Sequence, residues 1–350
     1  TVSPRLMEKR GVQLGGDLRF LERYFYGEAK AEVLPHDLVL GQSRSAVSLV
    51  ANYDHPGLMT GALNLNRVSD DNYFRDLSSR LAIAAQTTLP REGYLTYYGA
   101  WWNGGWWNAT GRFQAFQVLQ DASRSIPVPY WRAPQLALNA GKQDAAFGLD
   151  FNFAGEVVDF RHPTNVIGLR NTVYPSLSLP IITAGSFLTP KIGLHSTHYA
   201  FDPNGNVPAI MPGTAQPTAT SGALSRTLPI VSVDSGLIYE RNANWQGQNL
   251  IQTLEPRGYY LLVPHRDQGR IPLFDTAVAD FNYAQIFSEN SFVGGDRIND
   301  ANQLTLAVTS RLLFTSTGQE AVRATAGQRY YFRDQQVTLD STTMPRTYRS

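Results

Sequence analysis

The residues of this chain whose types and spacing come closest to a metal site are two histidines. His195 and His198 lie three positions apart, and on a helix that spacing would bring both rings to one metal ion. Side chains alternate between two faces along a strand, so on a strand the same odd spacing separates the two rings. The surrounding segment has the pattern of a strand, and the sequence therefore predicts no metal site here.

Acidic residues and nucleophiles give no catalytic set either. Adjacent Asp70 and Asp71 are the kind of pair that an acid protease uses, but they lie in a polar stretch where carboxylates are usually solvated. Residues 296–300 resemble a calcium loop, yet they lack its glycine and distal glutamate. The absence of cysteine excludes a thiolate site, and no Gly-x-Ser-x-Gly elbow occurs. We therefore expect no catalytic residue, no metal, no cofactor and no enzyme activity.

The elements that carry these residues are strands with a two-residue rhythm. Residues 147–153 read F-G-L-D-F-N-F, with the apolar side chains on one side and the polar ones on the other. The rhythm recurs along nearly the whole chain, while helical stretches are nearly absent. This pattern is typical of a sheet closed into a barrel, with lipid outside and water inside. The predicted fold class is all-β, a partial antiparallel up-and-down transmembrane β-barrel with about fourteen strands of a larger barrel.

Composition agrees with such a barrel. Aromatic residues make up 11% of the 350 residues, as expected if their rings line two membrane–water boundaries. The 30 basic and 29 acidic residues nearly balance, which argues against a nucleic-acid surface. No stretch approaches the roughly 18 consecutive apolar residues of a membrane-spanning helix.

Turn signals divide the chain into strands. A hairpin is expected around Tyr26–Gly27, a short helix within 70–79, and turns at Pro90–Gly93 and Asn103–Gly105. Long connections are expected at 202–223 and 264–300. The other predicted strands are 44–53, 58–67, 81–89, 93–102, 132–141, 146–158, 166–181, 186–201, 226–240, 248–263, 301–314 and 321–333.

Alternation along these strands assigns side chains to the two faces. Predicted lumen-facing residues are Glu28, Lys30, Glu32, Asn64, Asn66, Asp150, Asn152, Arg311, Arg323 and Arg329. Predicted lipid-facing residues are Phe147, Leu149, Phe151, Phe153, Leu304, Leu306 and Val308. Trp101, Trp102, Trp106 and Trp107 flank the Asn103–Gly105 turn and are expected to be interfacial anchors, although ring packing across a soluble hairpin would also explain them.

The carboxyl-terminal third contains distinctive sequence motifs. It reads R-T-L-P-I-V-S-V-D-S-G-L-I-Y-E-R over 226–241, Q-T-L-E-P-R-G-Y-Y-L-L-V-P-H-R-D-Q over 252–268 and G-G-D-R-I-N-D-A-N-Q-L-T over 294–305. This text closely resembles the LptD family, the lipopolysaccharide-assembly (organic solvent tolerance) proteins of Gram-negative outer membranes. The resemblance is strongest over 226–333 and extends more weakly to 1–11, which looks like the family's second barrel strand.

The resemblance implies an integral outer-membrane protein that inserts lipopolysaccharide into the outer leaflet through a barrel lumen and a lateral gate. It implies three partners: lipopolysaccharide, the lipoprotein LptE as a plug of the lumen, and the periplasmic Lpt bridge, which the family reaches through a jellyroll domain. Relative to the family, the jellyroll, the first and last barrel strands and the disulfide cysteines are missing. Residues 1–350 are therefore expected to be part of one barrel domain, with both ends cut.

Pro4 lies in the segment that matches the strand beside the family's gate. Proline lacks the N–H of the strand ladder, so it is expected to weaken that seam, whereas the alternative is an ordinary proline at the start of a strand. For 264–300 we expect a folded cap or a plug directed into the lumen, or else a solvated loop. Alternatives for the whole chain are another outer-membrane barrel, such as a porin or plugged transporter, and a soluble β-sandwich that binds carbohydrate.

Overall fold

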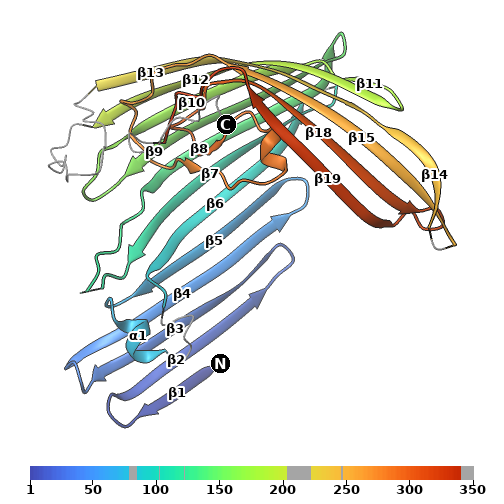
Figure 1. Ribbon diagram of the computed structural model, residues 1–350. Coiled ribbons are helices and arrows are strands. Elements are labelled where there is room, and N and C mark those ends of the chain that lie inside the picture. The colour runs from blue at the N-terminus through green and yellow to red at the C-terminus, as the bar shows by residue number, and fades with distance from the viewer. Residues whose placement is uncertain (79–84, 102, 122, 203–221, 246, 340–350) are drawn as a thin grey trace. The chain divides into compact units, whose positions relative to one another are not determined.

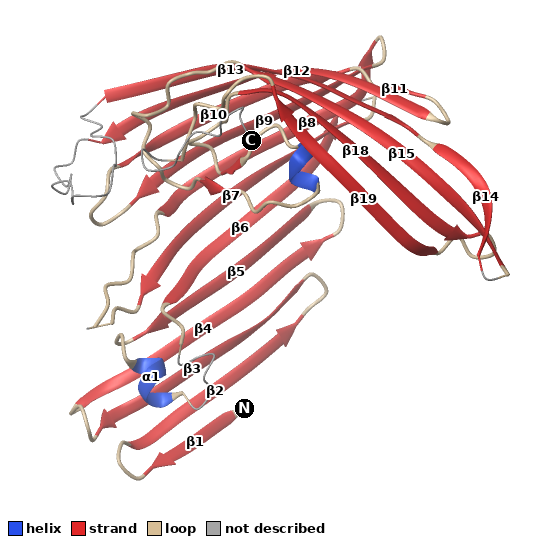
Figure 2. Cartoon of the chain, viewed as in Figure 1, coloured by secondary structure: helices blue, strands red, loops and turns tan. Residues whose placement is uncertain are grey.

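The chain is built almost wholly from strands (Figures 1 and 2). The computed structural model describes residues 1–78, 85–101, 103–121, 123–202, 222–245 and 247–339. Among these residues, no helix is both long and apolar enough to cross a membrane. The chain divides into two compact units, which are described separately: unit 1 comprises 1–139 and 156–170, and unit 2 comprises 140–155 and 171–350.

Unit 1 is an antiparallel meander in which each of the first seven strands pairs with the next one along the chain. Its elements are β1 (Val2–Met7), β2 (Gly11–Leu21), β3 (Phe25–Asp37), β4 (Gln42–His55), β5 (Met59–Val68), α1 (Tyr73–Leu77), β6 (Thr88–Trp101) and β7 (Gly105–Val118). Three further strands contribute residues to both units: β8 (Trp131–Ala146), β9 (Leu149–Arg161) and β10 (Ile167–Ser178).

Unit 2 continues the same antiparallel order. Its elements are β11 (Ile181–Ile182), β12 (Ser186–Asp202), β13 (Gly222–Leu237), β14 (Tyr239–Trp245), β15 (Gln248–Val263), β16 (Ala277–Val278), η1 (Ala284–Phe287, a 3-10 helix), β17 (Phe292–Val293), β18 (Ala301–Phe314) and β19 (Glu320–Tyr331). Both β13 and β14 pair with β15, so they act as one interrupted strand. Among the described residues, seventeen strands belong to one sheet, and β16 and β17 form a second.

The predicted fold class is confirmed: the chain is nearly all-β, antiparallel and up-and-down, as in a transmembrane barrel. The strands expected at 248–263 and 301–314 have those bounds as β15 and β18. The short helix expected within 70–79 is α1. Residues 203–221, which make up most of the connection expected at 202–223, lie outside the described residues.

The turn predicted at Pro90–Gly93 is wrong, because β6 runs straight through it. The pairing of β5 with β6 ends at Leu65 and Arg91, one step before Pro90. The missing proline N–H thus falls where the ladder ends, and the Asn66 side chain donates to the Pro90 carbonyl at 3.0 Å. Proline and glycine composition alone could not distinguish this ladder end from a turn.

Two other turns differ in their outcome. Asn103 and Gly104 have φ values of 63° and 78°, the left-handed conformation of a tight hairpin, so that turn is confirmed. Phe147 was expected inside a strand, but it lies in the turn between β8 and β9 with φ of 54° and is 98% exposed. Strand β9 begins two residues later, at Leu149. The hairpin around Tyr26–Gly27 instead turns just before β3 begins at Phe25.

Each unit has one face of its sheet covered by a chain segment. In unit 1, Leu34, Val68 and Leu89 pack with Tyr73 and Leu77 of α1, so we call this the α1 face and the other the reverse face of unit 1. In unit 2, the 264–300 segment packs its Ile298 on Leu228, Ile230, Tyr259, Leu261 and Val263. We call this the loop face and the other the reverse face of unit 2.

Candidate functional site

The edge strand β1 places its proline nitrogen away from β2. Thr1 and Asp17 exchange two backbone hydrogen bonds, of 2.6 and 2.9 Å. Opposed residues in an antiparallel pair alternate between hydrogen-bonded and non-hydrogen-bonded positions. Pro4 is opposite Leu14 in an unbroken register and therefore occupies a non-hydrogen-bonded position. Its nitrogen faces the side of β1 turned away from β2, where any other residue would offer an N–H.

A buried ion cluster fastens the α1 segment to the α1 face. The fully buried guanidinium of Arg44 on β4 contacts Asp37 at 3.1 Å, Asp70 at 2.7 Å and Asp76 at 3.0 Å. Arg10, in the turn after β1, adds contacts to Asp37 at 2.7 Å and to Asp76 at 3.4 Å. Two arginines thus hold three carboxylates from β3 and from the segment around α1.

Asp70 was expected to be solvated, but it is an ion-pair partner in this cluster. Burial alone would raise the pKa of Asp70, yet the hydrogen bonds from Arg44 and Ser69 outweigh it and hold that pKa below its usual range. No sequence argument singled out Arg44 or Arg10. The available signal was a charged residue at a strand position in phase with the polar side of β4.

A second polar contact joins α1 to three strands. The Tyr73 hydroxyl donates to Glu32 at 2.9 Å, and the Gln13 amide donates to both groups, at 2.9 and 3.1 Å. Burial, followed by the neighbouring Glu32 carboxylate, raises the pKa of Tyr73 and keeps the phenol neutral. From β1, the Arg5 guanidinium donates to the Leu77 carbonyl at 2.7 Å. The α1 segment therefore contacts the edge strand as well as the sheet.

The structure places all five predicted lumen residues of β3 and β5 on the α1 face. Glu28 pairs with Arg19 and Lys30, and Glu32 contacts Tyr73. On β5, Asn66 donates to Asn64 at 2.7 Å and accepts from Ser48 at 2.8 Å. These contacts form two polar clusters on the α1 face, one on β2 and β3 and one on β4 and β5.

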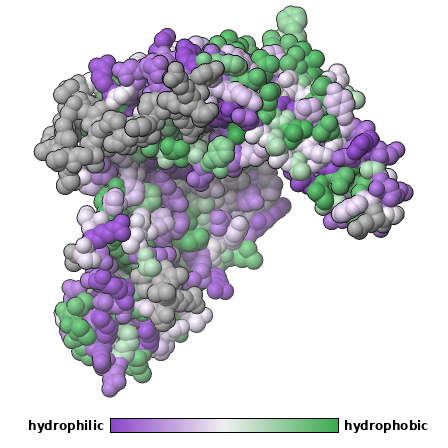
Figure 3. All heavy atoms as spheres, in the orientation of Figure 1, coloured by the Kyte–Doolittle hydropathy of each residue, from purple (hydrophilic) through white to green (hydrophobic). Residues whose placement is uncertain are grey.

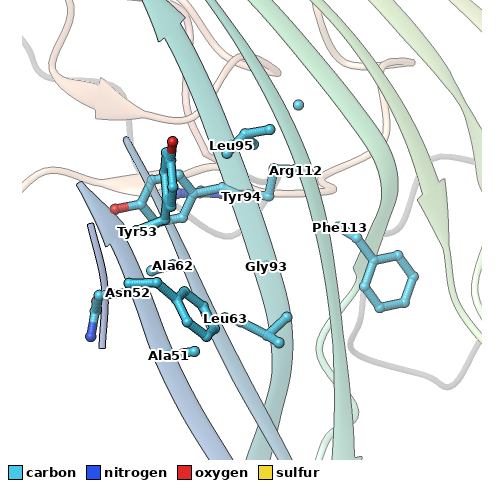
Figure 4. A pocket seen from close by; sticks show the side chains of 13 residues that line it. Ala51, Asn52, Tyr53, Ala62, Leu63, Gly93, Tyr94, Leu95, Arg112 and Phe113 are labelled. Atoms are coloured by element: carbon cyan, nitrogen blue, oxygen red, sulfur yellow. The ribbon is translucent and has the colours of Figure 1, made fainter. Parts of the chain in front are cut away.

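The reverse face of unit 1 is apolar and carries a shallow groove. Exposed apolar side chains occur on it along most strands, for example Leu14, Val47 and Leu95. Figure 3 shows that hydrophobic and hydrophilic residues also lie side by side on the surface turned toward the viewer. The groove, of about 460 Å³, is lined by Phe25, Ala51, Asn52, Tyr53, Gly61, Ala62, Leu63, Gly93, Tyr94, Leu95, Gly111, Arg112 and Phe113 (Figure 4). It opens where glycines replace side chains in the register, as at Gly93 opposite Leu63 and Phe113.

The tryptophans of the β6–β7 hairpin divide between the two faces. Trp101 lies over Gly105 and Trp107 over Gly99, so each ring covers a cross-strand glycine on the reverse face. Trp107 also contacts Tyr97, with 5.6 Å between ring centroids. Trp106 is one residue out of phase and lies on the α1 face, and Trp102 lies outside the described residues.

In unit 2 the 264–300 segment is a folded cover, not a solvated loop. Arg226 of β13 is buried and donates to the carbonyls of Gly295 and Asp296 at 2.8 and 2.9 Å. The buried Asp296 carboxylate accepts from the backbone N–H groups of Phe274 and Asp275, at 2.7 and 3.0 Å. Residues 294–300, part of the distinctive 294–305 motif, therefore contact residues 272–276 of the same segment. The expectation of a folded cap or plug holds for its folding and packing on the sheet.

The predicted basic residues of β18 and β19 share the loop face. Arg311 and Arg323 are direct cross-strand partners, and Arg329 donates to the Gln285 carbonyl of the cover at 2.7 Å. Leu306 and Val308 lie on the reverse face, 47% and 39% exposed, together with Leu304. On β9 the same alternation separates Leu149, Phe151 and Phe153 from Asp150 and Asn152.

No metal-binding cluster occurs among the described residues. The two histidines of β12 lie on opposite faces, as their odd spacing predicted. His195 packs on Tyr174, with 5.5 Å between ring centroids, and is opposite the buried Leu228 of the loop face. His198 contacts the Ser225 hydroxyl at 2.8 Å on the reverse face.

The model of a family described as LPS transport system D matches residues 52–350. The chain belongs to the LptD family. This confirms the resemblance seen in the sequence motifs and places the chain in the outer membrane of a Gram-negative bacterium.

Relatives named LPS-assembly protein LptD match nearly the whole chain. Those of Azoarcus sp. strain BH72 and Aromatoleum aromaticum are each 47% identical over 342 residues, which is 97% of this chain and 40% and 41% of the relatives. That of Thiobacillus denitrificans is 43% identical over 341 residues, 97% of this chain and 44% of the relative. The chain thus spans about two fifths of the length of these LptD relatives.

Proposed function

We propose that this chain is part of an LptD barrel that passes lipopolysaccharide to the outer leaflet. In this proposal the charged saccharide travels through a water-filled lumen, and the acyl chains leave sideways through a strand seam at β1. The transfer moves an intact molecule, so the chain has no catalytic step to perform. Support comes from the family and from the contrast between polar, covered faces and apolar reverse faces.

The observation that carries the proposal is the placement of Pro4. Its nitrogen faces away from β2, so the strand that pairs with the other edge of β1 in the full-length protein would meet one backbone position without a donor. An unsatisfied backbone group costs several kcal/mol in hydrocarbon, so barrels pair every strand. A seam that lacks one ladder hydrogen bond needs less free energy to separate than a fully bonded strand pair, so the barrel should open laterally there.

The two faces have different roles in this proposal. The α1 face and the loop face line the lumen, so the predicted lumen residues contact water, the saccharide or a lumen partner. The reverse faces contact lipid, with Leu304, Leu306, Val308 and the β9 side chains Leu149, Phe151 and Phe153 against acyl chains. Trp101 and Trp107 anchor the β6–β7 hairpin at one membrane boundary.

The partners belong to the whole protein. We include lipopolysaccharide as substrate, the lipoprotein LptE as a plug of the lumen, and the periplasmic Lpt bridge, which reaches the barrel through a jellyroll domain. Residues 1–350 would then form part of one barrel domain, with its remaining strands elsewhere in the full-length protein.

The proposal is tested by Pro4→Ala in the full-length protein. The substitution adds one N–H donor to the seam and is expected to reduce the arrival of lipopolysaccharide at the cell surface and to increase antibiotic permeability. Val2→Ala is the matched control, because Val2 has the same pairing phase but already possesses its N–H. Normal lipopolysaccharide export in the Pro4→Ala strain would remove the seam from the mechanism.

A further inference from the structure

Beside the cover segment, the loop face of unit 2 contains a recess of about 600 Å³, lined by apolar side chains and by several charged ones. It lies on β12, β13, β15, β18 and β19. Its lining residues are Phe187, Leu237, Ile238, Glu255, Pro256, Arg257, Tyr283, Thr309, Arg311, Arg323 and Thr325. We infer that this recess is a binding subsite for a phosphorylated sugar, which rests on the proposed passage of lipopolysaccharide through the lumen.

The floor of the recess presents two guanidinium groups side by side. Arg311 and Arg323 are directly opposed on β18 and β19, an arrangement in which like charges repel. Each is held by a carboxylate on its own flank: Arg311 by Glu255 at 2.8 Å, and Arg323 by Glu320 at 2.7 Å. The acids hold the two cations in place, and Glu255, which pairs with Arg311, also lines the recess.

Both arginines retain donors for a ligand. Each uses Nε and Nη2 for its carboxylate, which leaves Nη1 unused in the part of the chain that the structure describes. The side chains of Arg311 and Arg323 are 33% and 57% exposed, against 20% for Glu255 and 34% for Glu320. The surface offered to a ligand is therefore cationic, although the ion pairs as a set are neutral.

A phosphate group fits this pair of donors. It has three terminal oxygens and can accept from two guanidinium groups at once, whereas a carboxylate is planar and is usually held by one. A phosphate between Arg311 and Arg323 would also reduce the repulsion across the strand pair. The hydroxyl pair Thr309 and Thr325, 3.1 Å apart on the same floor, offers further hydrogen bonds to sugar hydroxyls.

Aromatic side chains supply the remaining feature of a sugar site. Phe187 lies over Gly236, beside Arg257 on the neighbouring strand. Tyr283 of the cover segment packs on Phe287, with 5.4 Å between ring centroids. Its hydroxyl lies 3.4 Å from the Thr309 hydroxyl. Rings beside a polar floor bind the apolar C–H face of a sugar while its hydroxyls bond to charged groups. Phosphate donors and aromatic walls together favour a phosphosugar over a free anion.

The test measures binding of a soluble probe to the purified full-length protein. The probe is the phosphorylated core oligosaccharide released from lipopolysaccharide, compared with the same oligosaccharide after dephosphorylation. We expect the phosphorylated probe to bind at least about tenfold more tightly, and the double variant Arg311→Gln, Arg323→Gln to lose that preference. Arg19→Gln removes an exposed arginine that is paired with Glu28 on the α1 face, and this matched control should keep the preference.

Three outcomes would overturn the inference: equal binding of both probes, an unchanged preference in the double variant, or the same loss in Arg19→Gln. Tyr283→Ala provides a second variant that leaves every ion pair intact, and it should weaken both probes equally by removing one wall. The binding assay does not depend on lateral opening of the barrel. Its failure would therefore overturn the subsite but not the seam at Pro4, and a failed Pro4 experiment would overturn the seam but not the binding result.

Discussion

Replacing Arg44 by glutamine should release the α1 segment from the sheet. The substitution keeps a polar side chain of similar length but removes the charge that Asp37, Asp70 and Asp76 share. Arg44 and Asp37 are both fully buried, so the Asp37 carboxylate loses a partner that water cannot replace. Removing one member of a buried ion pair costs about 3–5 kcal/mol. Asp70 and Asp76 are 22% and 24% exposed and recover some solvation, which favours the lower end near about 3 kcal/mol.

Limited proteolysis measures this change directly, because α1 contains a trypsin site at Arg75. The bond after Arg75 lies in a helical turn whose backbone is bonded from Asp76 to Asn72, so cleavage requires local opening. When opening is faster than cleavage, the rate follows the opened population. A loss of about 3 kcal/mol in the stability of the closed state therefore accelerates cleavage by roughly 100-fold. The fragments are identified and quantified over time by mass spectrometry.

Two controls separate charge from fold. Arg19→Gln removes an exposed pair worth at most about 1 kcal/mol and should leave cleavage at Arg75 nearly unchanged. In Arg44→Gln, Asp37 keeps its contact with Arg10 but has lost its fully buried partner. Adding Asp37→Asn removes this partly compensated charge and should restore part of the protection. If Arg44→Gln and Arg19→Gln accelerate cleavage equally, the ion cluster does not hold the segment, and the reasoning fails.

Two further predictions concern the faces and the pH. Leu306→Arg on the reverse face should destabilise the folded barrel by roughly 2–4 kcal/mol in urea titrations in lipid, while Thr325→Arg on the loop face should have a smaller effect; equal effects would contradict the assigned faces. The folded-state pKa of Asp70 lies below its ordinary value of 3.8, so its contribution is present above that pH and is lost as the pH falls through the lowered pKa. Cleavage within α1, measured with pepsin, which cuts beside residues such as Phe74 and Leu77, should therefore rise only below about pH 3.8, and a rise beginning near pH 6 would implicate another group.

The strands and their faces could be predicted because the two-residue period is a local property. Glu28, Lys30 and Glu32 are polar at every second position, and the structure places them together on the α1 face. The same rule explains why His195 and His198 separate. The rule fails where a strand gives way to a turn. Phe147 fits the alternation of the following strand, but it lies in the turn before that strand.

The covered parts could not be predicted, because they depend on residues distant in sequence. Leu228 and Ile230 are apolar on the loop face, where alternation alone predicts water-facing side chains. They are buried because Ile298, about seventy positions later, packs on them. No local pattern relates those segments. Asp70 was likewise interpreted as a solvated acid because its partner Arg44 is on a different strand.

The α1 segment of unit 1 and the 264–300 segment of unit 2 each cover one face of a sheet, and each is attached through a buried arginine. The chemistry of arginine explains why. One guanidinium has five N–H donors in a planar fork and stays charged when buried. Arg44 uses them on three carboxylates, and Arg226 uses them on two carbonyls and the Gln268 amide oxygen. Neither attachment uses a hydrogen bond of the strand ladder. A cover could therefore detach while the sheet remains paired, so the bore of the proposed barrel and its wall have separate stabilities.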